Sequence, residues 1–240
     1  MKKTFIILTL VTLCAAAIIA IRDFQRNQDT DVKAADRIAP KPEKIVVKVT
    51  PEPKKVPDRI MSGSETELRS SMRTLWELRA VLLRSYIVSS INDYKDVDEA
   101  RDKLLKNAGD LGASIKPYHG YFAGGMLAGF LKKDVSLTAK IIKTAKAGNE
   151  RDIEWAKKGW YANAFGLAGF FAITRNQTME YLTNMLYKHL DLTWGEIQSM
   201  LKKDKAKDLE YYEKDRAHMI MLSDVLTDGL VKQFPKRFIE

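Results

Sequence analysis

The spacing of apolar residues after Ser64 is the feature that most constrains the fold of this chain. From Ser64 to the C-terminus, no segment sustains the two-residue alternation of apolar and polar side chains that is typical of a strand. Apolar residues recur instead at intervals of three and four, as they do on one face of a helix. We therefore predict an all-α domain over residues 64–240, a bundle of four long helices with short connecting helices.

Capping signals predict where these helices begin and end. Ser64 with Glu67, and Thr193 with Glu196, have the spacing of a capping box, which favours a helix starting at each. Gly148 suits the left-handed residue that follows a helix. The predicted helices span residues 64–91, 96–107, 121–147, 151–173, 178–191 and 205–233, with a further start at residue 193.

The first 22 residues predict a membrane anchor or a signal peptide. Lys2 and Lys3 precede an apolar run at residues 4–21, which as a helix would be about 27 Å long, enough to cross a bilayer core. The three alanines at 15–17 would also suit signal cleavage, so an uncleaved signal-anchor and a cleaved signal both stay open. The lysines favour a cytosolic N-terminus. We expect a single-pass membrane protein with its bulk outside the cytosol, or a secreted protein if the signal is cleaved.

Residues 23–63 are predicted to form an extended linker. Five of the seven prolines lie between Pro40 and Pro57, interspersed with lysine and glutamate. Such a composition is typical of a semi-rigid spacer or of plain disorder, and both place the domain boundary near residue 63.

Two similar glycine-containing stretches raise the question of a close helix contact. Residues 121–131 read YFAGGMLAGFL and residues 161–171 read YANAFGLAGFF. Gly125 and Gly129 share one helix face, as do Ala164 and Ala168 with Gly169 beside them, and small residues at this spacing let helix backbones approach. We predict that helices 121–147 and 150–173 cross closely here; the alternative is that these glycines are merely tolerated.

Charge and cysteine content exclude several classes of function. Residues 64–240 carry 28 basic and 24 acidic side chains, a balanced surface that argues against a nucleic-acid partner. Cys14 is the only cysteine, which excludes an intrachain disulfide and any cysteine-based metal site. No nucleophile–base arrangement is evident, and the carboxylate pair Asp224 and Asp228 is typical of a solvated helix face. The sequence favours a protein that is not an enzyme. We expect His119, in the loop before Gly120, to be exposed.

Several motifs resemble a family of small bacterial and archaeal all-helical proteins of unknown function, often labelled "glycosyltransferase" or "acetylglutamate kinase". The resemblance covers roughly residues 70–238, and its most specific parts are WYANA at 160–164 and KQFP at 232–235. The chain lacks the alternating strand–helix pattern and the glycine-rich phosphate loops that enzymes with those two names need.

The resemblance implies a metal site in the bundle. Family members tend to carry a Glu-His pair in each of four helices, and the matching pairs here end in Arg79, Asp134, His189 and His218. Glu213 matches a family acid five residues before His218. The implied ligand set for iron, zinc or manganese is therefore Asp134, His189, Glu213 and His218. Arg79 would lie among these residues, where it could replace the metal's charge by pairing with Asp134.

Two functions follow as expectations. The first is a membrane-anchored, extracytoplasmic helical bundle that acts as a binding or structural module, attached to the membrane through its N-terminal helix and recognising a protein partner. The alternative is a metal-binding bundle, redox or sensory, with a partly degenerate ligand set.

Overall fold

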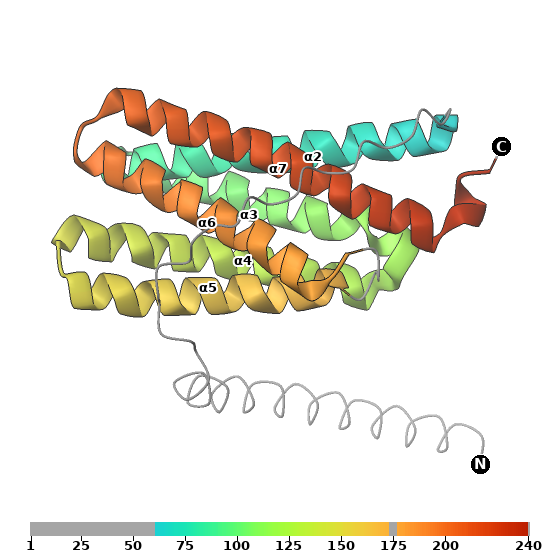
Figure 1. Ribbon diagram of the computed structural model, residues 1–240. Coiled ribbons are helices and arrows are strands. Elements are labelled where there is room, and N and C mark those ends of the chain that lie inside the picture. Colours follow the sequence, from blue (N-terminus) through green and yellow to red (C-terminus); the bar gives the residue numbers. More distant parts are fainter. Residues whose placement is uncertain (1–60, 173–176, 240) are drawn as a thin grey trace, which may run out of the picture. The chain divides into compact units, whose positions relative to one another are not determined.

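The computed structural model describes residues 61–172 and 177–239, and every regular element within these ranges is helical (Figure 1). The α-helices are α2 (Gly63–Ile91), α3 (Val97–Ser114), α4 (Lys116–Ala147), α5 (Glu150–Ala172), α6 (Met179–Leu201) and α7 (Lys205–Gln233), followed by the 3-10 helix η1 (Pro235–Arg237). The all-α prediction is confirmed. The predicted division into four long helices and short connecting helices is not confirmed, because the shortest of these α-helices has 18 residues. The predicted anchor at 1–22 and the linker up to residue 60 lie outside the described residues.

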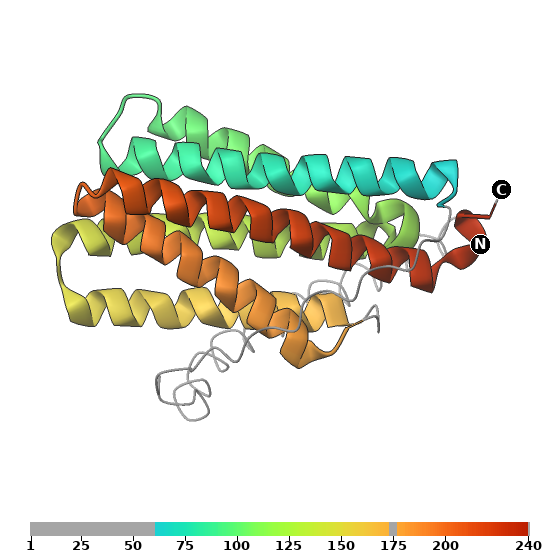
Figure 2. The same cartoon turned by 45° about the horizontal axis from the view of Figure 1, so that its top comes forward.

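Each α-helix packs against the next one in the sequence, and α7 returns to pack against α2. The connections are short, as at Gly148 and Asn149 between α4 and α5, so neighbouring helices run in opposite directions. Figures 1 and 2 show the helices lying side by side along a common direction. Of the helices in the described ranges, none is apolar over a length that would cross a membrane.

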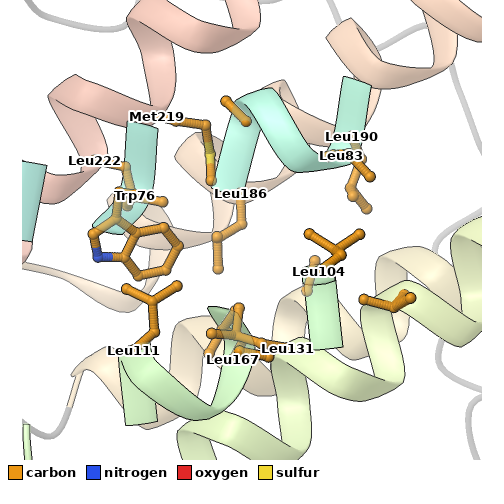
Figure 3. Packing of buried hydrophobic residues seen from close by; sticks show 14 of the residues in the cluster. Trp76, Leu83, Leu104, Leu111, Leu131, Leu167, Leu186, Leu190, Met219 and Leu222 are labelled. Atoms are coloured by element: carbon orange, nitrogen blue, oxygen red, sulfur yellow. The ribbon is translucent and has the colours of Figure 1, made fainter. Parts of the chain in front are cut away.

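The core of the bundle consists largely of leucines and holds two fully buried tryptophans, Trp76 and Trp160. Trp76 on α2 is 1% exposed, and it packs among leucines that every other helix of the bundle contributes (Figure 3). Its ring meets that of Phe171 on α5 edge to face, with 6.3 Å between centroids. The leucines labelled in Figure 3 include Leu111 on α3, Leu167 on α5, Leu186 on α6 and Leu222 on α7.

The helix starts agree with the predictions only in part. Thr178 caps α6 as predicted, accepting a hydrogen bond from the Tyr181 amide. The cap of α2 is Ser62 rather than Ser64, with its hydroxyl accepting from the Glu65 amide at 3.2 Å. The predicted start at Thr193 is wrong: Thr193 lies inside α6 and its hydroxyl donates to the carbonyl of His189. The predicted end of the second helix near residue 107 is also wrong, since α3 continues to Ser114.

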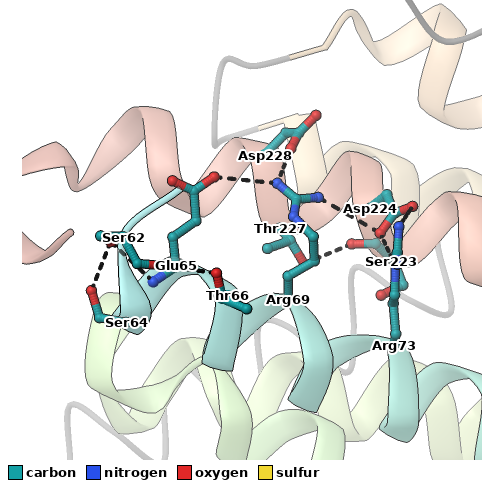
Figure 4. Close-up of polar contacts among 10 residues, drawn as sticks. All are labelled: Ser62, Ser64, Glu65, Thr66, Arg69, Arg73, Ser223, Asp224, Thr227 and Asp228. Carbon is teal, nitrogen blue, oxygen red and sulfur yellow. Dashed lines mark hydrogen bonds and ion pairs between the residues drawn. The ribbon is translucent and has the colours of Figure 1, made fainter. Parts of the chain in front are cut away.

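Ion pairs join the start of α2 to the end of α7 (Figure 4). Arg69 donates to Asp228 at 2.7 Å, and Arg73 holds both oxygens of Asp224 at 2.6 and 2.8 Å. The two aspartates lie one turn apart on α7, and Arg69 reaches both, because its Nη1 also lies 3.6 Å from Oδ1 of Asp224. Arg73 is half exposed, so its pair contributes little to stability, whereas Arg69 is more buried.

The predicted crossing of α4 and α5 at the repeated glycines is wrong. A Cβ atom added to Gly125 or Gly129 would meet nothing within 4 Å, although α4 and α5 do pack together. The close backbone approach joins α3 to α4 instead: a Cβ on Gly112 would lie 2.3 Å from the carbonyl oxygen of Gly124 and 2.8 Å from Cβ of Ala128. Within residues 121–131, the glycine that packs against a neighbouring helix is thus Gly124, one position before the predicted Gly125, while in the second stretch a Cβ on Gly166 would lie 2.9 Å from the Phe130 ring.

A kink at Gly120 separates the first turn of α4 from the rest. Gly120 has φ 82° and ψ 174°, a backbone conformation that only glycine adopts readily. Pro117 lies in the first turn, where its missing N–H costs nothing. The kink turns the segment carrying His119 back against the end of α7, where the His119 ring meets Phe234 edge to face at 5.2 Å.

Candidate functional site

Four helices each contribute one polar side chain to the interior, at the positions that the family resemblance singled out. They are Arg79 on α2, Asp134 on α4, His189 on α6 and His218 on α7, and none is more than 8% exposed. Buried polar groups at this depth require partners. The hydrogen-bond partners of these four residues determine whether they are free to bind a metal or a ligand.

Arg79 and Asp134 form a buried ion pair, as predicted from the sequence. Nη2 of Arg79 donates to Oδ2 of Asp134 at 2.7 Å and to the carbonyl of Leu131 at 3.2 Å. The other carboxylate oxygen accepts from the indole Nε1 of Trp160 at 2.8 Å. Both oxygens of Asp134 are therefore engaged by protein donors.

His189 is paired with a carboxylate that the sequence analysis missed. Its Nδ1 lies 2.7 Å from Oδ1 of Asp215, which is 3% exposed. Burial acts to lower the pKa of His189, but the charge and hydrogen bond of Asp215 outweigh it, and the pKa is raised above its ordinary value. A shared helix face could have revealed this pairing: Asp215 lies three residues before His218, about 60° away around the helix, whereas Glu213 lies about 140° away.

The hydrogen-bond partner of His218 is a backbone carbonyl group. Its Nε2–H donates to the carbonyl of Met185 at 2.7 Å, and burial lowers the pKa of His218. Glu213, the fourth predicted ligand, is exposed on the surface of α7. The structure thus brings Asp134, His189 and His218 into the interior and leaves Glu213 outside. Across residues 61–172 and 177–239, no three His, Cys, Asp or Glu side chains are grouped as a metal would require.

A second buried charge cluster links α2, α6 and α7. Arg84 donates to Glu196 at 2.9 Å and to both oxygens of Asp208, one of them at 2.8 Å, with the ring of Tyr212 lying 5.4 Å from the guanidinium. Glu196 is 2% exposed, and burial raises its pKa to about 7 against the opposing charge of Arg84. The sequence analysis had assigned Glu196 to a helix cap. Each acid here has a basic partner, so the cluster holds helices together and offers no free nucleophile.

An apolar pocket lies where α2 passes the start of α4 and the ends of α5 and α7. Its volume is about 230 Å³. Four rings contribute to the wall: Trp76, His119, Phe170 and Phe171. Aliphatic side chains from α2, α4, α7 and the junction of α3 with α4 complete it: Met72, Ile115, Ala123, Leu127, Leu226 and Leu230.

Two of the residues that line the pocket each have a ring nitrogen that is closed to solvent and has no hydrogen-bond partner among the described residues. These nitrogens are Nε1 of Trp76 and Nε2 of His119. A buried indole N–H normally has an acceptor, so Trp76 is an exception that calls for an explanation. Burial also lowers the pKa of His119, which keeps the imidazole neutral at pH 7. The prediction that His119 is exposed is wrong in this respect, because the kink at Gly120 folds the ring inward.

The sequence matches no family model, and neither the curated proteins nor the solved structures include one with significant similarity to it. The family resemblance therefore stays a prediction, and the function has to be argued from the site itself.

Proposed function

We propose that this chain is a membrane-anchored binding module whose helical domain lies outside the cytosol and whose apolar pocket takes a small apolar ligand. The observation that carries the proposal is the pocket of about 230 Å³ with an almost wholly hydrocarbon wall. Ligand sites are typically concave and mostly apolar, with a few polar groups that orient the ligand.

The buried charges support binding rather than catalysis. The acids of the interior are matched with arginine or histidine: Asp134 with Arg79, Asp215 with His189, and Glu196 with Arg84. A general acid or base has to reach a substrate, and none of these pairs lines the pocket. The pairs favour a rigid scaffold, on which a preformed pocket binds with little loss of conformational entropy.

Thermal unfolding with ethylbenzene tests the pocket. A ligand that binds only the folded state raises Tm, so ethylbenzene should raise the Tm of the full chain in lipid nanodiscs. Ala123→Leu, which fills the pocket, should remove most of that rise. Ala139→Leu is the matched control, because Ala139 is also partly buried on α4 but does not line the pocket. An equal rise in all three proteins would place the effect outside the pocket and contradict the proposal.

Fractionation and intact mass test the anchor. We expect the chain in the membrane fraction with residues 1–22 retained, and the helical domain open to protease added on the side opposite the cytosol. A soluble chain that lacks these residues would instead identify a cleaved signal and a secreted binding module.

A further inference from the structure

We propose that the outer face of the hairpin formed by α4 and α5 lies against the surface of a bilayer that contains anionic lipids. The inference goes beyond the pocket, and it rests on the proposed function in one respect, since the anchor would keep the domain near a membrane. Figure 1 shows α4 and α5 side by side along one side of the bundle. Six side chains define the outer face: Phe122, Lys132 and Lys143 on α4, and Trp155, Lys158 and Phe165 on α5.

The hairpin carries the whole excess of positive charge of the helical domain. Residues 116–172 contain nine basic and four acidic side chains, whereas the rest of residues 64–240 contains 19 basic and 20 acidic ones. Asp134, one of the four acids, is buried and paired with Arg79. The other three lie close together at the start of α5: Glu150, Asp152 and Glu154. An anionic surface is therefore attracted to this hairpin more strongly than to the rest of the domain.

The basic side chains of the hairpin follow one face of each helix. Lys132, Lys140 and Lys143 on α4 lie within about 80° of one another around the helix axis. The one acid of α4, Asp134, points into the bundle instead. Arg151 and Lys158 on α5 are seven residues apart, which is close to two turns, and both are exposed.

A contact across the hairpin shows that these two basic faces adjoin. Nζ of Lys140 on α4 lies 3.3 Å from the centre of the Trp155 ring on α5. Trp155 is four residues after Arg151 and three before Lys158, so the three side chains share one face of α5. The lysines of α4 and the basic residues of α5 thus form one continuous surface.

Exposed aromatic rings lie on the same surface. Phe122 is 81% exposed, Trp155 61% and Phe165 52%. Phe122 precedes Lys140 by 18 residues, which is five full turns, and Phe165 follows Lys158 by about two turns, so the rings point in the same direction as the lysines. Helices that lie on a membrane surface combine aromatic side chains, which enter the interface, with lysines that contact the headgroups.

The length and charge of this surface favour a bilayer over a second copy of the chain. From Phe122 to Lys143, α4 extends over about 30 Å at 1.5 Å per residue. Rings and lysines spread over such a length fit a broad, flat partner. A second copy would bring the same positive charge to the contact, and like charges repel each other.

A fluorescent label that responds to its surroundings tests the contact in the full chain in nanodiscs. Cys14→Ser removes the native thiol, and Phe165→Cys then carries the label on the proposed face. Leu209→Cys is the matched control, because Leu209 on α7 is 50% exposed and lies outside the hairpin. The nanodiscs contain an equal mixture of phosphatidylcholine and phosphatidylglycerol. The label at position 165 should emit at shorter wavelength there and be quenched by nitroxide-bearing lipids, whereas the label at position 209 should show neither effect.

Charge gives the second arm of the test. The shift at position 165 should be lost in nanodiscs of phosphatidylcholine alone, and it should decrease at about 1 M salt, where the Debye length falls to about 3 Å. Lys132→Glu/Lys143→Glu should also remove the shift, because it reverses two exposed charges of the face. Lys188→Glu/Lys205→Glu, which reverses two exposed lysines outside the hairpin, should leave the shift unchanged.

Three outcomes decide the inference. Equal emission of the two labels in both kinds of nanodisc would overturn it and leave the pocket and the anchor standing, since ethylbenzene binding and fractionation test these separately. A shift at position 165 that the nitroxide-bearing lipids do not quench would indicate a protein contact and would also overturn it. If residues 1–22 are cleaved, the anchor fails, and the same labels are read on the soluble chain with anionic vesicles, where the inference requires the same quenched shift.

Discussion

Nη2 of Arg79 on α2 lies 2.7 Å from Oδ2 of Asp134 on α4, and both side chains are buried in the bundle. This pair lies where the family resemblance expects metal ligands, and it joins two helices that are not neighbours in sequence. The positive charge of Arg79 thus balances the Asp134 carboxylate inside the bundle.

Replacing Arg79 alone should destabilise the domain strongly. Arg79→Met leaves the Asp134 carboxylate buried without a cation, and breaking a buried pair in this way costs about 3–5 kcal/mol. The free energy of unfolding, from urea denaturation of the full chain, measures this cost. In the double variant Arg79→Met/Asp134→Asn no charge remains, and Trp160 keeps an acceptor, so most of the loss should be recovered. A single variant within 1 kcal/mol of the unaltered chain would show that the pair is not formed.

The stability of the chain should depend on pH through Glu196. Its pKa is about 7 in the folded protein and 4.5 ordinarily, so the folded state binds the proton more tightly than the unfolded state. The contribution of Glu196 to stability is therefore greatest below about pH 4.5 and is lost as pH rises to about 7. His189, with a raised pKa, acts in the same direction, whereas His218, with a lowered pKa, acts in the opposite one.

Glu196→Gln isolates this effect, because the amide mimics the protonated acid at every pH. Relative to this variant, the unaltered chain should lose roughly 2–3 kcal/mol of unfolding free energy between pH 5 and pH 8. Urea unfolding at four pH values within that window gives the difference. Parallel pH profiles for the two proteins would mean that Glu196 is ionised throughout, held so by Arg84.

Features set by local sequence were predictable. The bounds of α7 at residues 205–233 and the left-handed Gly148 after α4 agree with the structure, because capping and apolar spacing act within a few residues. The pairing of Arg79 with Asp134 was also predictable, since a buried arginine needs an acid and the resemblance placed the two positions together.

Features set by the rotation and contact of helices were not predictable. Choosing Asp215 over Glu213 required taking the face of α7 that carries His218 as the buried one, because the two acids lie on different faces. The close approach of α3 to α4 at Gly112 is a contact between two separate segments. The local sequence shows which glycines lie on a helix, but it does not show which of them contacts another helix. His119, which lines the pocket beside Trp76, directly precedes the kink at Gly120, and no local signal gives the direction in which the chain turns there.

Metal analysis of the full chain should find no stoichiometric iron, zinc or manganese. Asp134 has both oxygens engaged, Nε2 of His218 donates to Met185, and Glu213 is exposed, so the predicted ligand set does not converge. Elemental analysis after purification without chelator or affinity-tag metal measures this. The Tm should also be unchanged by EDTA. Near-stoichiometric metal that is lost in the variant His189→Ala/His218→Ala would restore the alternative function, a metal-binding bundle.

Alanine substitutions at two helical glycines should have opposite effects on stability. Gly112→Ala places a Cβ 2.3 Å from the backbone oxygen of Gly124, which forces α3 and α4 apart and should cost about 1–3 kcal/mol. Gly125→Ala meets open space within a helix, where alanine is favoured over glycine by about 0.5–1 kcal/mol, so it should stabilise the chain by that amount. Urea unfolding of both variants measures the two effects on one scale. The opposite result, a damaging Gly125→Ala and a harmless Gly112→Ala, would contradict the packing of α3 on α4. The small-residue contact would then lie between α4 and α5, as the sequence predicted.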